Sequence, residues 1–86
     1  MDKDKVLEEL DKIVPPHSGM SIIDLGIVKD IHIDKKRKKI EVLLLPHDTF
    51  CPIRYISKEI ERRLKNLGFQ EIHVYLKIKN HTIKIL

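Results

Sequence analysis

The stretch IVKDIHIDKKRKKIEVLLL, residues 27–45, decides the fold, because two runs of alternating side chains flank a polar turn. Apolar residues recur with a period of two as far as Ile33, and the same period returns from Ile40 to Leu44. Such a period is typical of strands that bury one face. The run DKKRKK, residues 34–39, forms the turn between them. The sequence therefore predicts a β-hairpin with a longer loop.

Strict alternation also assigns the faces of the first strand. Ile27, Ile31 and Ile33 share one face with Lys29, and Val28 lies on the opposite face with the polar residues. The isoleucine face is the one that we expect to be buried.

Two helices are predicted around this hairpin. Residues 3–14 have apolar side chains at helical spacing, and the prolines at 15 and 16 end the helix because proline disfavours helical geometry in the residue before it. The apolar stripe consists of Val6, Leu7, Leu10, Ile13 and Val14. Residues 53–67 carry a second stripe. Pro52 suits the first helical position, and Gly68 suits a left-handed residue that closes the helix.

Strand patterning returns at the end of the chain. Residues 71–79 alternate between apolar and polar side chains, and TIKIL, residues 82–86, is a short fourth strand. Residues 1–86 are enough for one domain with one modest core. We predict an α+β fold, a two-layer α/β sandwich of order α-β-β-α-β-(β), with both helices on one face of a small mixed or antiparallel sheet.

Composition excludes several classes of protein. One cysteine among 86 residues cannot form an internal disulfide, so a disulfide-stapled secreted fold is excluded. The charged start, MDKDKVLEEL, lacks the apolar core of a signal peptide. The longest apolar run is far shorter than the roughly 20 residues of a membrane span. We expect a cytoplasmic protein that does not enter the membrane.

The net charge of +4 comes mostly from one cluster in the hairpin turn. The cluster consists of Lys35, Lys36, Arg37, Lys38 and Lys39. It is either a solvated turn or an anion-binding patch, and the element order is close to that of KH domains. However, the chain has no G-x-x-G loop and only two Phe and two Tyr for base stacking. A nucleic-acid-binding module is therefore the alternative function, and nucleic acid is not the favoured partner.

The single thiol, Cys51, stands near the start of the second helix. Free N–H groups and the helix dipole favour an anion there, so the pKa of the thiol can fall below about 8.5. A thiolate can act as a nucleophile, a redox sensor or a metal ligand. The alternative is a small buried hydrophobe, although Cys51 is out of step with the apolar stripe that begins at Ile53. No histidine lies in a local catalytic signature, so we do not expect an enzyme.

Two stretches together resemble the SufT/PaaD-type iron–sulfur cluster assembly domain family. They are SIIDLGIVKDIHID, residues 21–34, and the Cys-Pro pair that opens the second helix, with the hairpin between them. The resemblance is collinear over residues 5–79. It implies a small α/β domain that acts as a carrier, scaffold or adaptor, with Cys51 as the reactive cysteine and Asp24 in the family's D-L-G turn. That turn is expected near the cysteine loop.

The implied cargo is a transient iron–sulfur cluster or iron. Clusters usually take four cysteine ligands, so one thiol must share a cluster with a second copy, a partner protein or small thiols. The resemblance thus implies other assembly proteins and apo-client proteins as partners, and a homodimer is one way to share the cluster. A third reading is an interaction domain with an incidental thiol.

The chain also departs from the family pattern. The family's D-P-E falls on Pro15, Pro16 and His17, its threonine before the cysteine falls on His47, and its tryptophan-containing tail is missing. If the loops converge, His17, His47 and Cys51 form a mixed nitrogen and sulfur site for zinc or iron, with Asp48 close by.

Overall fold

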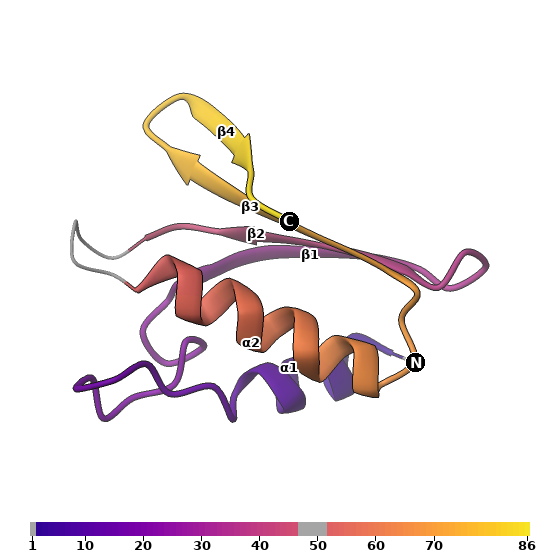
Figure 1. Cartoon of the computed structure of the whole chain (residues 1–86), viewed down its shortest axis with the longest axis horizontal. Helices are drawn as coiled ribbons and strands as arrows, with labels where there is room; N and C mark the ends of the chain where they lie inside the picture. The colour runs from indigo at the N-terminus through magenta and orange to yellow at the C-terminus, as the bar shows by residue number, and fades with distance from the viewer. Residues whose placement is uncertain (1, 47–51) are drawn as a thin grey trace.

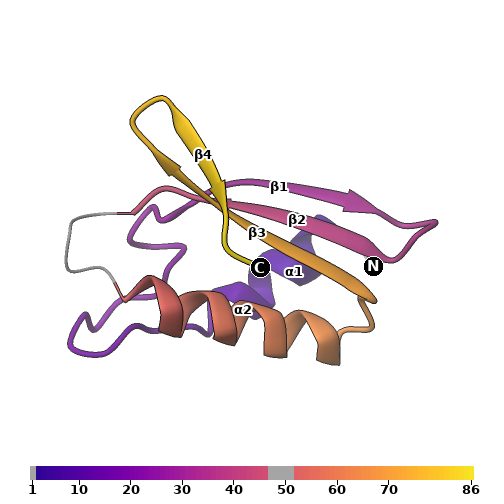
Figure 2. The ribbon, with the colours of Figure 1, turned by 45° about the horizontal axis from the view of Figure 1, so that its top comes forward.

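Two helices lie on one face of a four-stranded sheet in the computed structural model of the chain (Figure 1). The structure describes residues 2–46 and 52–86. The elements are α1 (Lys3–Leu10), β1 (Val28–Asp34), β2 (Lys39–Leu44), α2 (Ile53–Asn66), β3 (Glu71–Ile78) and β4 (His81–Lys84). Figure 2 shows the same two layers from another direction. The predicted α+β sandwich is confirmed.

The sheet is mixed, with strand order β1-β2-β3-β4. β1 and β2 form the predicted antiparallel hairpin, in which Ile33 pairs with Ile40. β2 and β3 are parallel because α2 carries the chain back along the sheet between them, and Ile40 pairs with Ile72. β3 and β4 are antiparallel. The fourth strand is therefore present.

A β-bulge corrects the predicted faces of the first strand. The register shifts between Val28 and Asp30, so Val28 pairs with the buried Leu44 and packs against the core. Lys29 is exposed rather than buried. Strict alternation was wrong here because the extra residue of a bulge moves the preceding side chain to the other face.

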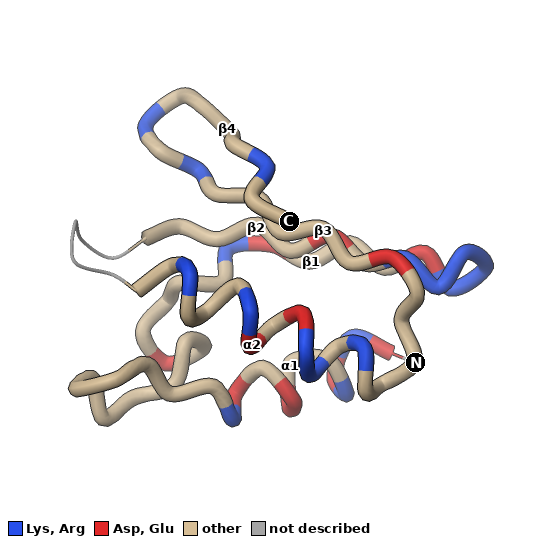
Figure 3. Tube along the Cα trace, viewed as in Figure 1, with Lys and Arg blue, Asp and Glu red and all other residues tan. Residues whose placement is uncertain are grey.

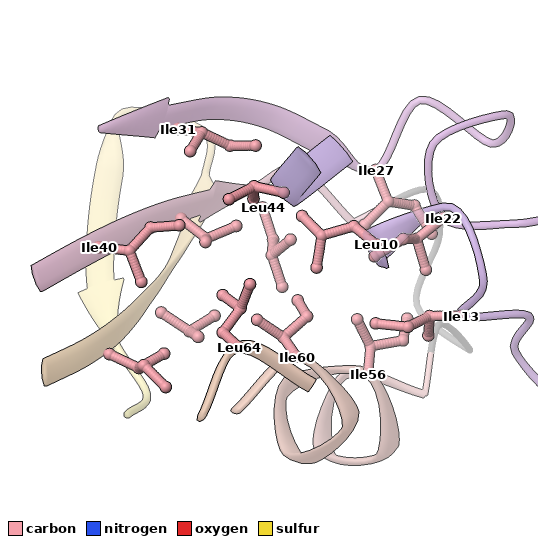
Figure 4. Close-up of a cluster of buried hydrophobic side chains, with 14 of the residues drawn as sticks. Leu10, Ile13, Ile22, Ile27, Ile31, Ile40, Leu44, Ile56, Ile60 and Leu64 are labelled. Carbon is pink, nitrogen blue, oxygen red and sulfur yellow. The ribbon is translucent and has the colours of Figure 1, made fainter. Parts of the chain in front are cut away.

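The core is aliphatic except for one phenylalanine and lies between the helices and the sheet (Figure 4). Its members come from both helices, from β1 to β3, and from the segments joining them. They are Val6, Leu10, Ile13, Ile22, Ile27, Ile31, Ile40, Val42, Leu44, Ile56, Ile60, Leu64, Phe69, Ile72 and Val74. Burial of these side chains supplies the main favourable term in folding.

The first helix is shorter than predicted. It begins after Asp2, whose carboxylate accepts a hydrogen bond from the backbone N–H of Lys5, and it ends at Leu10 rather than at residue 14. Ile13 is buried, but its carbonyl accepts the backbone N–H of Ile22 at 2.9 Å instead of an intrahelical bond. Val14 is 45% exposed, so its place in the buried stripe was wrong. Pro15 and Pro16 have no N–H to donate to the carbonyls of Asp11 and Lys12, so the helix cannot continue with regular bonds to residue 14.

The second helix has the predicted ends to within one residue. Pro52 is the N-cap rather than the first helical residue, and Leu67 is the C-cap. Gly68 has φ +107°, and the N–H of Phe69 bonds the carbonyl of Leu64 at 3.2 Å. This is a Schellman motif, which needs a left-handed residue. The described helices include none that is long and apolar enough to cross a membrane.

Candidate functional site

The D-L-G sequence forms one tight turn with a cap at each end. The hydroxyl of Ser21 accepts the backbone N–H of Asp24 at 3.1 Å and donates to the carboxylate of Asp11. At the other end, the N–H of Ile27 donates to the carbonyl of Ile22 at 3.0 Å. This pattern is that of a Schellman motif around Gly26. Because Ser21 also bonds Asp11, the turn is attached to the end of α1.

Glycine is required at position 26 by the backbone conformation and not by a lack of room for a side chain. Its φ is +71°, in the left-handed region, and no atom lies within 4 Å of the place where a Cβ would stand. On either side, Ile22 and Ile27 are buried in the core. Left-handed geometry at Gly26 is what lets both isoleucines point inward. The physical basis of the IIDLGI sequence is therefore a capped turn with two apolar anchors.

This turn lies at the end of the sheet where the cysteine-bearing segment begins. The N–H of Leu45 donates to the carbonyl of Ile27 at 2.7 Å, so the chain leaving β2 is bonded to the residue after Gly26. The start of α2 is at the same end (Figure 1). The D-L-G turn is thus bonded to the chain just before positions 47–51, while the cysteine loop itself lies outside the described residues.

Asp24 and His17 are both exposed in this region. Among the described residues, the carboxylate of Asp24 has no hydrogen-bond partner, and only its backbone N–H is bonded to Ser21. His17 lies in a turn closed by the N–H of Ser18 to the carbonyl of Pro15 at 3.2 Å. Its φ is +66°. Both side chains are accessible to a ligand or a partner.

The other predicted site residues, His47 and Cys51, lie outside the described residues, as does Asp48. The mixed zinc or iron site with His17 therefore stays a prediction. In the parts of the chain that the structure covers, no three His, Cys, Asp or Glu side chains are grouped to hold a metal ion. A site built from three such side chains of this chain would therefore have to include residues outside the described ranges.

The start of α2 has a favourable electrostatic setting for an anion. Pro52 cannot cap the helix through its side chain, and Ile53, Arg54 and Tyr55 include no acidic residue. The first N–H groups of a helix and its dipole create a positive end, which acids in the first turn commonly offset. This end of α2 directly follows Cys51 in the sequence.

The basic hairpin turn lies at the opposite end of the sheet from the D-L-G turn (Figure 3). It is organised by Asp34, whose Oδ1 accepts the backbone N–H of Lys36 at 3.1 Å and of Arg37 at 3.2 Å. Lys38 has φ +53°, and its carbonyl accepts the N–H of Gln70 at 2.8 Å. These contacts are those of a solvated turn tied to the sheet. The basic cluster is thus separate from the D-L-G end.

Sequence reasoning missed a polar network on the open face of the sheet. The hydroxyl of Tyr75 donates to Glu41 at 3.1 Å, and this bond together with desolvation raises the pKa of Tyr75. Nearby, His32 lies 3.2 Å from Asp30. His73 is partly buried, and its Nδ1 has no described partner. The pairing of β2 with β3 brings Tyr75 beside Glu41, a contact for which periodicity gave no signal, whereas His32 and Asp30 lie two residues apart on the same strand.

Comparison with known proteins agrees with this geometry. The model of the family described as iron–sulfur cluster assembly protein matches residues 3–74. The chain belongs to this family. The match covers the D-L-G turn, the hairpin, the cysteine and α2, and it ends within β3.

An uncharacterized protein from Methanocaldococcus jannaschii is 28% identical over 90 residues, covering 95% of this chain and 94% of that protein. A crystal structure of the DUF59 domain of unknown function from Bacillus anthracis has a TM-score of 0.77. It is 22% identical and covers 90% of this chain and 74% of that one. This likeness shows the shared fold.

Proposed function

We propose that this protein is a carrier or adaptor in iron–sulfur cluster assembly and that the thiol of Cys51 holds the cargo or contacts the partner. Membership of the family identifies the process as iron–sulfur cluster assembly. The observation that carries the finer proposal is the bond between Leu45 and Ile27, which joins the D-L-G turn to the segment that leads to the cysteine. A motif typical of the family is thereby bonded to the chain six residues before the cysteine in the sequence.

The positive end of α2 supports a reactive thiol. A thiolate one residue before the N-cap of a helix is favoured in its charged form by the positive end of the helix dipole. Thiolate rather than thiol is the form that binds iron or attacks a disulfide. Asp24 and His17, which are both exposed, are available as further contacts for the cargo or the partner.

A single thiol suits temporary ligation. Since a cluster needs about four ligands, the remaining ones have to come from a second copy, a partner protein or small thiols. Such shared ligation can be exchanged stepwise, with each thiolate of an apo-client replacing one ligand. The proposed cargo is therefore an iron–sulfur cluster or iron in transit, and the partners are assembly proteins and apo-clients.

Anaerobic reconstitution with iron and sulfide tests this proposal. We expect sulfur-to-iron charge-transfer bands in the visible spectrum of the wild-type protein and a native mass that includes iron and sulfide. The Cys51→Ser variant is expected to lose both while keeping the far-UV circular dichroism of the wild type.

Equal bands in the two proteins would contradict a role for the thiol in ligation. An absence of bands in both would leave the adaptor as the only form of the proposal. In that case, Cys51→Ser should still weaken capture of assembly proteins by the immobilised chain. If it does not, Cys51 has no role in either form.

A further inference from the structure

A groove lies between the first turns of α2 and the end of the chain. It has a volume of about 340 Å³. The lining residues are Ile53, Arg54, Ser57, Lys58, Ile85 and Leu86. The floor is apolar, and the long cationic side chains belong to α2. This groove is separate from the D-L-G turn and from the polar network on the open face of the sheet.

Backbone hydrogen bonds hold the second wall of the groove in place. The N–H of Ile85 donates to the carbonyl of Val74 at 2.8 Å, and the N–H of Val74 donates to the carbonyl of Leu86 at 3.3 Å. These bonds continue the pairing of β4 with β3 beyond Lys84, the last paired residue of β4. Ile85 and Leu86 are also packed against the core. The wall is therefore part of the folded sheet.

Apolar surface continues from the groove onto the β3–β4 hairpin. Ile83 pairs with Leu76 on the side of the sheet that faces the helices, and Ile83 remains 47% exposed. Ile78, on the same side of β3, is 43% exposed. Figure 1 shows why: the hairpin turns away from the helices, so neither helix covers it. Exposed apolar side chains gathered next to a groove are typical of an interaction surface.

The surface has one sign of charge. The groove contributes Arg54 and Lys58, and none of its lining side chains is acidic. Residues 75–86 contain no Asp or Glu, but Lys77 and Lys84 pair with Thr82 and Tyr75 and so lie on the open face of the sheet, which leaves Arg54 and Lys58 as the cationic rim. Figure 3 shows the hairpin in blue and tan only. An apolar floor with a cationic rim is complementary to a segment whose apolar side chains alternate with carboxylates.

We infer that this groove and the adjoining hairpin form a docking surface for an extended, acidic and apolar segment of a partner protein. The inference rests on the proposed function, because it names the chemistry of the partner that receives or delivers the cargo. Ile53 lies two residues after Cys51, so a segment in the groove would bring its own protein next to the thiol. The wall formed by Ile85 and Leu86 lies outside residues 3–74, which the family model matches.

Peptide binding tests the docking surface without any cluster. The probe is a fluorescein-labelled peptide of alternating leucine and glutamate, read by fluorescence anisotropy against the full chain carrying Cys51→Ser. The control peptide has lysine in place of each glutamate. We expect the acidic peptide to bind and the basic peptide not to bind. Equal binding of the two peptides, or none by the acidic one, overturns the inference.

Charge reversal locates the binding. Arg54→Glu combined with Lys58→Glu should lower the affinity for the acidic peptide about tenfold or more, because two attractive charges become two repulsive ones. The matched control is Lys35→Glu combined with Lys36→Glu, which makes the same change in net charge in the hairpin turn at the far end. If both double variants weaken binding equally, the affinity depends only on the net charge of the protein and the groove is not the binding site.

Sedimentation velocity tests the other occupant, a second copy of the chain. Wild-type protein that remains monomeric at the peptide-binding concentration supports a partner segment. A dimer that disappears with the Arg54 and Lys58 substitutions would show that a second copy fills the groove, and would overturn the inference. Because every measurement uses Cys51→Ser or apo-protein, the docking surface and the cluster-binding proposal fail independently.

Discussion

Gly26 shows how one residue shapes the D-L-G turn. Its φ of +71° costs a residue with a Cβ roughly 1–2 kcal/mol, and the surrounding space is open. We expect Gly26→Ala to lower the free energy of unfolding by about that amount, measured by urea denaturation. Gly26→Asn should lower the free energy of unfolding by less, since Asn tolerates left-handed geometry. Equal losses for the two variants would mean that backbone strain is not the cause.

Ser21 is the residue that ties the turn to α1. It is 5% exposed, and it both accepts from Asp24 and donates to Asp11. Ser21→Ala is expected to cost about 1–2 kcal/mol of unfolding free energy, because it removes a cap and a charge-assisted bond. Combining it with Asp11→Asn should cost less than the sum of the single changes. Strict additivity would indicate that the two side chains do not interact.

The predicted zinc or iron site can also be tested by changing one residue. If His17 is a ligand, His17→Asn should weaken zinc binding at least about tenfold, while Asn preserves the left-handed backbone. His32→Ala is the control, because His32 is exposed on the open face of the sheet. Zinc titration followed by native mass spectrometry measures both. An unchanged affinity in His17→Asn removes His17 from the site.

The two helices are joined by an ionic contact that depends on pH. Glu9 of α1 accepts from Lys12 at 3.2 Å and from Arg63 of α2 at 3.0 Å, and these bonds lower the pKa of Glu9 below its ordinary 4.5. A lowered folded-state pKa stabilises the fold above the ordinary pKa, and this stabilisation is lost as the pH falls through the folded-state pKa.

Glu9→Gln should therefore lower the unfolding midpoint in urea near pH 7, and the difference from wild type should shrink below the ordinary carboxyl range. The effect is expected to be small because the contact is at the surface. Glu8→Gln, on the exposed face of the same helix, is the control. A difference that stays constant with pH would rule out the ionic origin.

At the scale of the whole molecule, the fold keeps its two candidate regions apart. The D-L-G turn, the end of β2 and the start of α2 meet at one end of the sheet, and the basic turn is at the other. We expect Lys35→Glu with Lys36→Glu to leave cluster reconstitution unchanged, in contrast to Cys51→Ser. Loss of the charge-transfer bands in the double variant would contradict this separation.

The sequence by itself determined the elements and the two layers. A period of two and a period of 3.6 are local signals, so the hairpin, α2 and β3 were predictable, and so was the closing role of Gly68. The resemblance carried by the D-L-G motif and the Cys-Pro pair led to the correct family. Each of these inferences depends on residues that are neighbours along the chain.

Only the tertiary structure decided the remaining features. Asp11 and Ile13, which follow the last residue of α1, bond to residues 21 and 22, and Val28 turns inward because a bulge interrupts β1. The groove exists because Ile85 and Leu86 return to β3 beside α2. These contacts join residues that are distant in sequence, and their energies depend on three-dimensional proximity, which no local pattern encodes.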